Sequence, residues 1–338
     1  MLNAQFIKFY VPKENLTVDE QLLGYRGRVP GKTYMPSKPR KYGVKIFWIS
    51  EADCGYALKG FIYTGKSSEG VHRNLAFDIV KDLTTPFYNS GRNIVCNNFF
   101  TSHDLATFLL TKKLTLLGTV RSHRREIPNY VRTLEGRDSF DARSIYDHEN
   151  KIMVLSYIPK RKKNVILMSS GDHNAEIDDS DTRRPIIITE YYNKLKGGVD
   201  LLDQQIEEYT VRRKTNRWPL LLFYDYLDVG CYNSYILIRG SAPSYDRKKF
   251  LKELAFNLSK PFAERRLQNP KLQAHIRQAA VQVGYHEPLD STESSQPRSS
   301  GRCFTCSRKT RSFCDTCVKP ICPAHRRMTR TTICFSCD

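Results

Sequence analysis

The first 120 residues alternate between short β-rich runs and stretches in which apolar residues have helical spacing. The β-rich runs are separated by glycine and aspartate turn signals and predict strands. These predicted strands occupy residues 16–23, 45–50, 56–64, 93–100 and 114–120. Apolar residues recur every three or four positions in 72–83 and 102–112, which predicts two helices, the second capped by Ser102. This order predicts an α/β layered domain.

The pattern changes after residue 120. Three further predicted strands, which look like a β module inserted into the α/β domain, lie at residues 152–158, 165–169 and 185–191. Residues 197–285 have a helical pattern, and the helix predicted at 220–238 is apolar nearly all round, so we expect it to be buried. We expect Asn216 to cap that helix. Residues 286–301 are polar and rich in proline and serine, as in a linker.

Cysteine is concentrated near the C-terminus, where seven of the ten cysteines lie between Cys303 and Cys337. With one histidine they form four pairs, each with two intervening residues: Cys303 and Cys306, Cys314 and Cys317, Cys322 and His325, Cys334 and Cys337. Tetrahedral zinc takes four Cys or His ligands, so eight ligands predict two structural Zn²⁺ ions. The spacing between pairs favours a cross-brace, in which pairs one and three hold one ion and pairs two and four the other. Reduced thiols, or disulfides in a secreted module, are the alternative.

The net charge of the chain predicts a polyanionic partner. The chain has 54 Lys and Arg against 35 Asp and Glu, a formal charge of +19, which indicates nucleic acid or an anionic membrane surface. No apolar run approaches the roughly 20 residues of a spanning helix, which argues against the membrane. The start of the sequence lacks the basic-then-apolar pattern of a signal peptide, so we expect a soluble intracellular protein.

Two basic clusters are candidates for contacts with phosphate groups. The first follows the predicted helix that carries Asp200 and consists of Arg212, Arg213, Lys214 and Arg217. The second lies in the Cys-rich tail and consists of Arg308, Lys309, Arg311, Arg326 and Arg327. A charge run is usually a solvated face, but the neighbouring Trp218 and the nearby acidic residues favour DNA contacts for the first cluster.

Carboxylates occur at two places that suit metal chemistry. Asp19 lies inside an apolar strand, where an isolated charge is costly to bury. Asp200 and Asp203 are three residues apart in a predicted helix and therefore share a helix face. A ribonuclease-H-like nuclease needs carboxylates on a first strand and a late helix, where they hold a pair of Mg²⁺ ions. Surface salt bridges and helix caps explain the same residues, so the pattern alone leaves both interpretations open.

Longer motifs carry a resemblance to a known family. The segments LTVDEQLLGYRGR, KPRKYGVKI, GTVRSHRREIP, YYNKLKGGVDLLDQ and RRKTNRWP strongly resemble the piggyBac family of DNA transposases. The match is collinear from about Leu16 to Cys337. It implies a ribonuclease-H-like catalytic domain with an inserted β module, half of a helical DNA-binding and dimerisation domain, and a Cys-rich finger that binds transposon ends.

The resemblance also assigns site residues. The first and third catalytic aspartates of the family fall on Asp19 and Asp200, and a supporting aspartate falls on Asp203. The second belongs in a strand motif that reads Cys-Asp-Asn before two aromatic residues, and here Asn97 stands at that position. An amide oxygen can contact Mg²⁺ but lacks the negative charge of a carboxylate. We therefore expect impaired catalysis, as in a decayed or domesticated copy.

The resemblance implies the following organisation. The first part of the core occupies 1–120, the inserted β module 121–190, a helix completing the core 191–210, the helical half-domain 211–285, the linker 286–301 and the zinc finger 302–338. The family carries a further region ahead of the first motif, so we expect an N-terminally truncated chain.

Taken together, these features predict a nuclear, transposase-derived DNA-binding protein. Its expected partner is double-stranded DNA resembling transposon ends, and we also expect a homodimer. Two Zn²⁺ ions would be structural, and Mg²⁺ would be the ancestral catalytic cofactor. The alternative is a protein-interaction or chromatin module built on the cross-brace finger, against which the basic tail argues.

Overall fold

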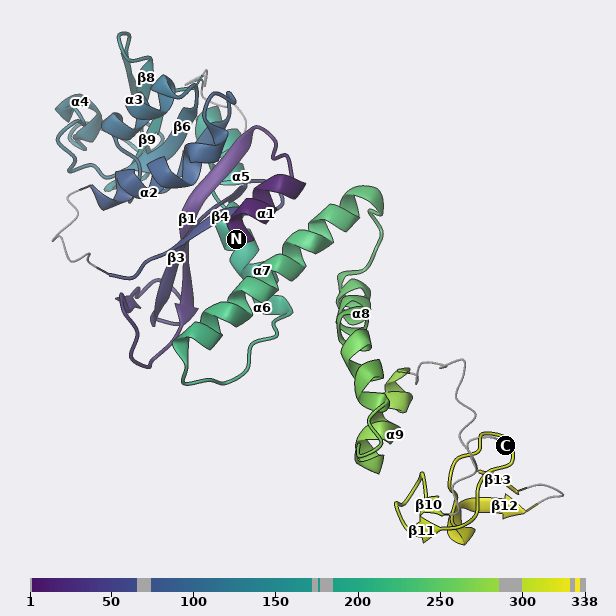
Figure 1. Cartoon of the computed structure of the whole chain (residues 1–338). Helices are drawn as coiled ribbons and strands as arrows, with labels where there is room; N and C mark the ends of the chain where they lie inside the picture. Colours follow the sequence, from purple (N-terminus) through teal and green to yellow (C-terminus); the bar gives the residue numbers. More distant parts are fainter. Residues whose placement is uncertain are drawn as a thin grey trace. The chain divides into compact units, whose positions relative to one another are not determined.

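The computed structural model describes residues 2–65, 74–171, 176, 185–285, 300–328 and 332–334 (Figure 1). The chain divides into two compact units, Met1–Ser244 and Tyr245–Asp338. No helix in the described residues is both long enough and apolar enough to cross a membrane.

The first unit is built on one mixed sheet. Its strands are β1 (Asn15–Gly24), β2 (Thr33–Tyr34), β3 (Tyr42–Glu51), β4 (Ala57–Ile62), β5 (Asn93–Cys96), β6 (Thr115–Val120), β7 (Ala142–Asp147), β8 (Ile152–Lys160) and β9 (Lys163–Ser169). They are ordered β2-β3-β1-β5-β6-β9-β8-β7, and β4 pairs with the other side of β3. All five strands predicted in the first 120 residues are present, but the one predicted at 93–100 ends at Cys96, which leaves Asn97 just beyond it.

The centre of this sheet places β1 between an antiparallel and a parallel neighbour. β1 pairs antiparallel with β3, with Asp19 opposite Trp48, and parallel with β5, with Val18 opposite Cys96. Both neighbours, β3 and β5, are mostly buried, and their apolar residues pack in the core together with those of β1. The register fixes what lies beside Asp19: the residue that follows Cys96, which is Asn97.

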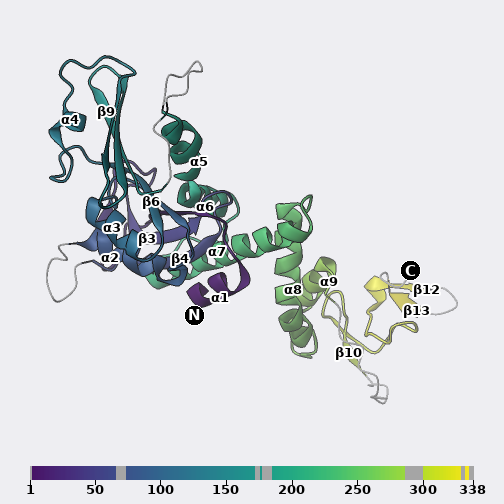
Figure 2. The same ribbon diagram turned by 90° about the horizontal axis from the view of Figure 1, so that it is seen from above.

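Helices cover both faces of the sheet (Figure 2). They are α1 (Leu2–Phe9), α2 (Leu75–Thr84), α3 (His103–Thr111), α4 (Asn129–Arg132), α5 (Asn193–Leu195), α6 (Gly198–Glu208) and α7 (Trp218–Ser241), with short 3-10 and π turns at Thr85–Phe87 and Ile187–Tyr192. Ser102 caps α3 as predicted, since its side chain accepts from the Leu105 N–H. On β1, Thr17 and Gln21 share a face that contacts α5 and α6.

Three local predictions are wrong. Residues 185–191 were expected to form a strand, but Ile187–Tyr192 is a π-helix that continues into α5. The apolar residues there follow a helical period and pack as one face into a core cluster. The expected all-round burial of 220–238 also fails, because Phe223 on α7 is 55% exposed and only one face of the helix is buried. The N-cap position of α7 is occupied by Arg217, without a side-chain cap hydrogen bond, and not by Asn216, whose carbonyl accepts from the Tyr25 hydroxyl.

The second unit contains two helices and a small finger. The helices are α8 (Arg247–Leu267) and α9 (Ala274–Val283). The finger contains β10 (Gly301–Arg302), β11 (Lys309–Thr310), a 3-10 turn at Pro323–His325, β12 (Arg326–Met328) and β13 (Thr332–Cys334). Most of the predicted linker, 286–299, lies outside the described residues.

Candidate functional site

Asp19 and Asn97 meet at the end of the parallel pair β1 and β5. Asn97 immediately follows β5, and its side-chain Nδ2 lies 2.7 Å from Oδ1 of Asp19 and 3.3 Å from Oε2 of Glu20. Its Oδ1 accepts a hydrogen bond of 2.8 Å from the Phe99 N–H. A backbone N–H can only donate, so the oxygen of Asn97 faces Phe99 and the NH₂ group faces the carboxylates.

Helix α6 brings the other two acidic residues to the same side of β1. Asp200 and Asp203 lie on consecutive turns of α6, which packs on β1 and β3. Asp200 forms an ion pair with Lys38, whose Nζ is 3.2 Å from Oδ1. Asp203 accepts a hydrogen bond of 3.0 Å from Nε2 of Gln21. The residues singled out in the sequence as Asp19, Asn97, Asp200 and Asp203 therefore come together in one site, which we call the acidic site.

The acidic site is electrostatically crowded. Burial raises the pKa of Asp19 well above its ordinary value, and the negative charges of Glu20 and Asp200 raise it further. Burial also raises the pKa of Asp203, although the hydrogen bond from Gln21 and the charge of Lys38 partly offset the effect. A site of this kind gains free energy from any nearby positive charge.

The donor set suits oxygen-binding cations only in part. Carboxylate oxygens are the ligands that Mg²⁺ prefers, and Asp19 and Asp200 supply them. Beside Asp19, where the family resemblance predicts a third carboxylate, the chain presents the NH₂ group of Asn97. This group is a hydrogen-bond donor and repels a cation. Within the described residues, the acidic side chains do not form a group of three whose ligand atoms lie within 4.8 Å of one another. The residues present do not fit a two-metal site, and we derive no reaction step through it.

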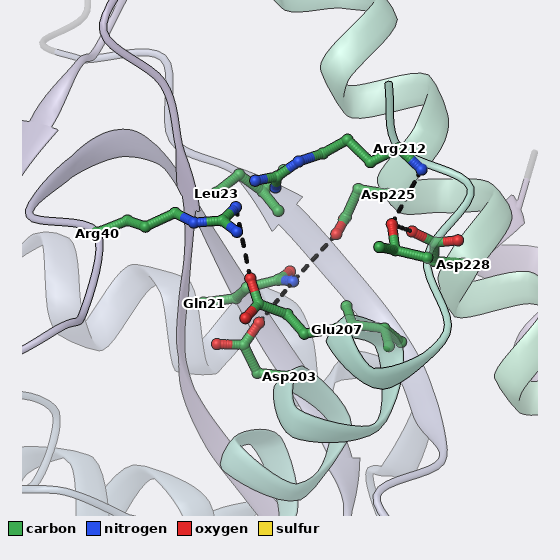
Figure 3. A pocket seen from close by; sticks show the side chains of 10 residues that line it. Gln21, Leu23, Arg40, Asp203, Glu207, Arg212, Asp225 and Asp228 are labelled. Atoms are coloured by element: carbon green, nitrogen blue, oxygen red, sulfur yellow. Dashed lines mark hydrogen bonds and ion pairs between the residues drawn. The ribbon is translucent and has the colours of Figure 1, made fainter. Parts of the chain in front are cut away.

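A buried polar network connects the acidic site to α7 (Figure 3). The buried amide of Gln21 accepts from Trp48 Nε1 at 2.8 Å and donates from Nε2 to both Asp203 and Asp225, each at 3.0 Å. Within the described residues, the second oxygen of Asp225 has no hydrogen-bond partner. Burial raises the pKa of Asp225 to about 8, with smaller contributions from Asp203 and Asp228. Gln21 thus ties β1, β3, α6 and α7 together.

This network borders a cavity of about 70 Å³. Its charged lining consists of Arg40, Asp203, Glu207, Arg212, Asp225 and Asp228. Two of the acids have partners of their own: Glu207 pairs with Arg40 at 3.6 Å, and Asp228 accepts from the Thr210 hydroxyl and the Val211 N–H. Asp228 therefore anchors the loop between α6 and α7.

The finger holds a second cluster, of a different chemistry. Cys303, Cys306, Cys322 and His325 place their ligand atoms within 4.8 Å of one another. The separations are 3.5 Å from Cys306 Sγ to Cys322 Sγ and 3.3 Å from Cys322 Sγ to His325 Nδ1. A tetrahedral zinc ion with Zn–S bonds of about 2.3 Å needs edges of about 3.8 Å between sulfurs. The set can therefore hold a metal ion with little movement.

This cluster joins predicted pairs one and three, as the cross-brace requires. Burial raises the pKa of the Cys303 thiol, but backbone N–H groups near Cys322 and Cys306 lower it by more, to about 6. Of the other two pairs, Cys314 is buried and Cys317 half-buried. The side chains of Cys334 and Cys337 lie outside the described residues, so the second ion stays a prediction.

Most of the basic candidates are exposed. Arg213, Lys214 and Arg217 lie on the surface of the loop before α7, and Arg212 is half-buried beside the cavity. In the finger, Arg308, Lys309 and Arg311 are exposed, and Arg326 is half-buried with a bond of 3.4 Å to the Ser312 hydroxyl. The side chain of Arg327 lies outside the described residues.

Three polar residues of the site had no signal of their own in the sequence. Lys38 and Gln21 lie in two of the motifs that carry the family resemblance, and Asp225 lies in the helix predicted to be buried, but no pattern assigned any of them to the site. Gln21 offers the one available clue. It is two residues after Asp19 and must share its face of the strand.

Comparison with known proteins adds the family. A family model described as Transposase IS4 matches residues 1–235. The human PiggyBac transposable element-derived protein 3 is 26% identical over 244 residues, which cover 66% of this chain and 40% of that protein. The human PiggyBac transposable element-derived protein 2 is 23% identical over 262 residues, covering 70% and 43% of the two chains. This chain therefore spans less than half the length of these relatives.

A solved structure matches the fold. It is a cryo-EM structure of a piggyBac transposase synaptic complex with hairpin DNA, 36% identical, with a TM-score of 0.80 over 99% of this chain and 72% of that one. The match confirms the predicted ribonuclease-H-like α/β fold. Together with the family model over residues 1–235, it shows that this chain belongs to the IS4-type transposases, in the piggyBac family.

Proposed function

We propose that this chain is a transposase-derived DNA-binding protein whose DNA-cleaving activity is impaired. The ancestral activity is metal-dependent cleavage and strand transfer of DNA, with Asp19, Asp200 and Asp203 as the surviving acidic residues. The observation that carries the proposal is the NH₂ group of Asn97, directed at Asp19 over 2.7 Å. A donor lies where the chemistry needs an acceptor.

The physical argument concerns charge. A pair of divalent cations, when bound, activates water and stabilises the leaving oxygen of a phosphodiester, and carboxylates must offset the repulsion between the ions. Asn97 removes one negative charge from that set. Turning its amide over would place the oxygen against Asp19 and Glu20 and the NH₂ against the Phe99 N–H, which breaks three hydrogen bonds. The side chain is therefore held as a donor.

DNA binding uses other parts of the chain in this proposal. The exposed cluster before α7 and the exposed basic side chains of the finger supply phosphate contacts, and the +19 charge favours a polyanion in general. Two structural Zn²⁺ ions would fold the finger, one of them at Cys303, Cys306, Cys322 and His325. A DNA-binding role implies a nuclear location.

Salt-dependent binding tests the DNA-binding part. Each phosphate contact adds about 0.9 to the slope of log affinity against log salt on duplex DNA. Replacing Arg213, Lys214 and Arg217 by glutamine should lower that slope by roughly two to three. A matched triple replacement of Lys8, Lys112 and Lys113 controls for the loss of charge alone. If the native chain bound duplex DNA with no salt dependence, DNA would not be its partner. DNase-resistant capture of protein partners would then support the interaction-module alternative.

A further inference from the structure

A lysine lies inside the acidic site. Lys38 comes from the loop between β2 and β3, and its Nζ is 3.2 Å from Oδ1 of Asp200. The Lys38 side chain is 20% exposed, whereas that of Asp200 is 66% exposed. The lysine side chain is therefore mostly covered where it meets Asp200, and the carboxylate remains accessible to solvent.

The loop holds Lys38 in this position. The Met35 N–H donates to the Lys41 carbonyl at 2.8 Å, and the Lys38 N–H donates to the Met35 carbonyl at 3.2 Å. These two bonds close residues 35–41 into a turn whose ends continue into β2 and β3. The backbone of Lys38 is thus held by the turn, and its side chain reaches Asp200 from a fixed starting point.

Lys38 experiences the charge of the whole site. Burial lowers its pKa, but the carboxylate of Asp200, and then those of Asp19 and Asp203, outweigh the burial, and the pKa is raised. A lysine is positively charged at neutral pH on its ordinary pKa, and the ion pair of 3.2 Å with Asp200 keeps this charge beside the acidic residues of the site. On the other side of the site, the NH₂ group of Asn97 donates a hydrogen bond to Asp19.

We propose that Lys38 is an internal counter-ion of the acidic site, competing with a divalent cation for Asp200. The inference rests on the proposed function in one respect, namely that the acidic site descends from a metal site. A cation that binds Oδ1 of Asp200 must displace the ammonium group or bear its repulsion. With Asn97 donating to Asp19 and Lys38 to Asp200, the chain itself supplies a donor to each carboxylate that would otherwise hold the metal.

Mn²⁺ binding to the zinc-loaded full chain tests this proposal, with the free ion counted by electron paramagnetic resonance. Lys38→Met should tighten Mn²⁺ binding by roughly tenfold or more, since even near a protein surface a unit positive charge a few ångströms from the ion repels it strongly. Lys38→Arg keeps the charge and should bind as weakly as the native chain. Lys59→Met is the matched control: Lys59 is 19% exposed and pairs with Asp82, 58% exposed, at 3.0 Å. It should leave Mn²⁺ affinity unchanged.

Two further variants make the outcome decisive. Asp200→Asn added to Lys38→Met should abolish the gain, which places the ion at Asp200 and away from the finger. Asn97→Asp tests the proposed function separately: an affinity gain from Lys38→Met without one from Asn97→Asp supports the counter-ion and contradicts the role given to Asn97. Equal Mn²⁺ affinity of the native chain and Lys38→Met, with matching thermal melting curves, overturns the counter-ion. If Lys38→Met does not fold, Lys38→Gln carries the same prediction.

Discussion

Asn97 donates a hydrogen bond of 2.7 Å to Asp19 across the parallel strands β1 and β5. The same Oδ1 of Asp19 accepts the Glu20 N–H at 2.8 Å. The carboxylate to which we assign the ancestral metal chemistry therefore accepts, through Oδ1, from two hydrogen-bond donors of this chain. Both donors stabilise the ionised form of Asp19, against the burial and the neighbouring negative charges that disfavour it.

Asn97→Asp should consequently destabilise the metal-free protein. The aspartate can still accept from the Phe99 N–H, but its other oxygen faces Asp19 and leaves two carboxylates in contact. We expect a loss of about 1–3 kcal/mol at neutral pH, measured by urea unfolding without divalent cations. Saturating Mn²⁺ should restore stability to the variant and have little effect on the native chain. Equal stability of both chains without metal would show that the hydrogen bond to Asp19 contributes nothing.

Asp225→Asn should stabilise the protein in a pH-dependent way. Burial raises the pKa of Asp225 from 3.8 to about 8, so the folded state keeps a proton that the unfolded state releases. The free energy of unfolding is therefore not lowered by Asp225 below about pH 4. It falls as the pH rises and has lost the full amount above about pH 8. The variant keeps an acceptor for Gln21 and removes this cost. Its advantage should be near zero at about pH 4 and a few kcal/mol at about pH 8. A pH-independent difference would rule out the buried proton.

Gln21→Leu should destabilise the first unit more than a typical surface change. It leaves Asp203 and Asp225 without their shared donor and Trp48 Nε1 without its acceptor. Each buried polar group left unpaired costs about 1–3 kcal/mol, so we expect the three groups together to cost at least about 3 kcal/mol in denaturant unfolding. Gln278→Leu, at an exposed position of α9, should change stability by less than about 0.5 kcal/mol. Similar values for the two variants would refute a network centred on Gln21.

The finger should carry two zinc ions per chain. Native mass spectrometry of the full chain should show both, and a chelator should remove them and unfold the finger, since structural zinc supplies on the order of 10 kcal/mol of folding free energy. Cys322→Ser should lose one ion, because its Sγ lies in the cluster with Cys306 and His325. Cys231→Ser, on α7, should retain both. A native stoichiometry of one would disprove the cross-brace.

The sequence predicted the elements that carry the site better than the contacts between its side chains. The strand of Asp19 and the helix of Asp200 follow from apolar periodicity, and the Cys and His spacing predicted the set found around Cys322. The strand predicted at residues 185–191 was wrong because β-branched isoleucines favour strands locally, whereas here they pack into the core as one face of a helix. Lys38 could not be predicted, because its contact with Asp200 joins residues 162 positions apart. A contact between residues so far apart in the sequence depends on how the elements pack in the fold, which local patterns do not encode.

The most direct test of the account is cleavage of DNA that the chain itself binds. A duplex would be selected from a random pool by the native protein and then incubated with the native chain and with Asn97→Asp, in Mg²⁺ or Mn²⁺. The account predicts that both proteins bind the duplex equally well, that the native chain leaves it intact, and that any strand cleavage by Asn97→Asp is about 10²- to 10⁴-fold faster. Cleavage by the native chain at the rate of Asn97→Asp would contradict it.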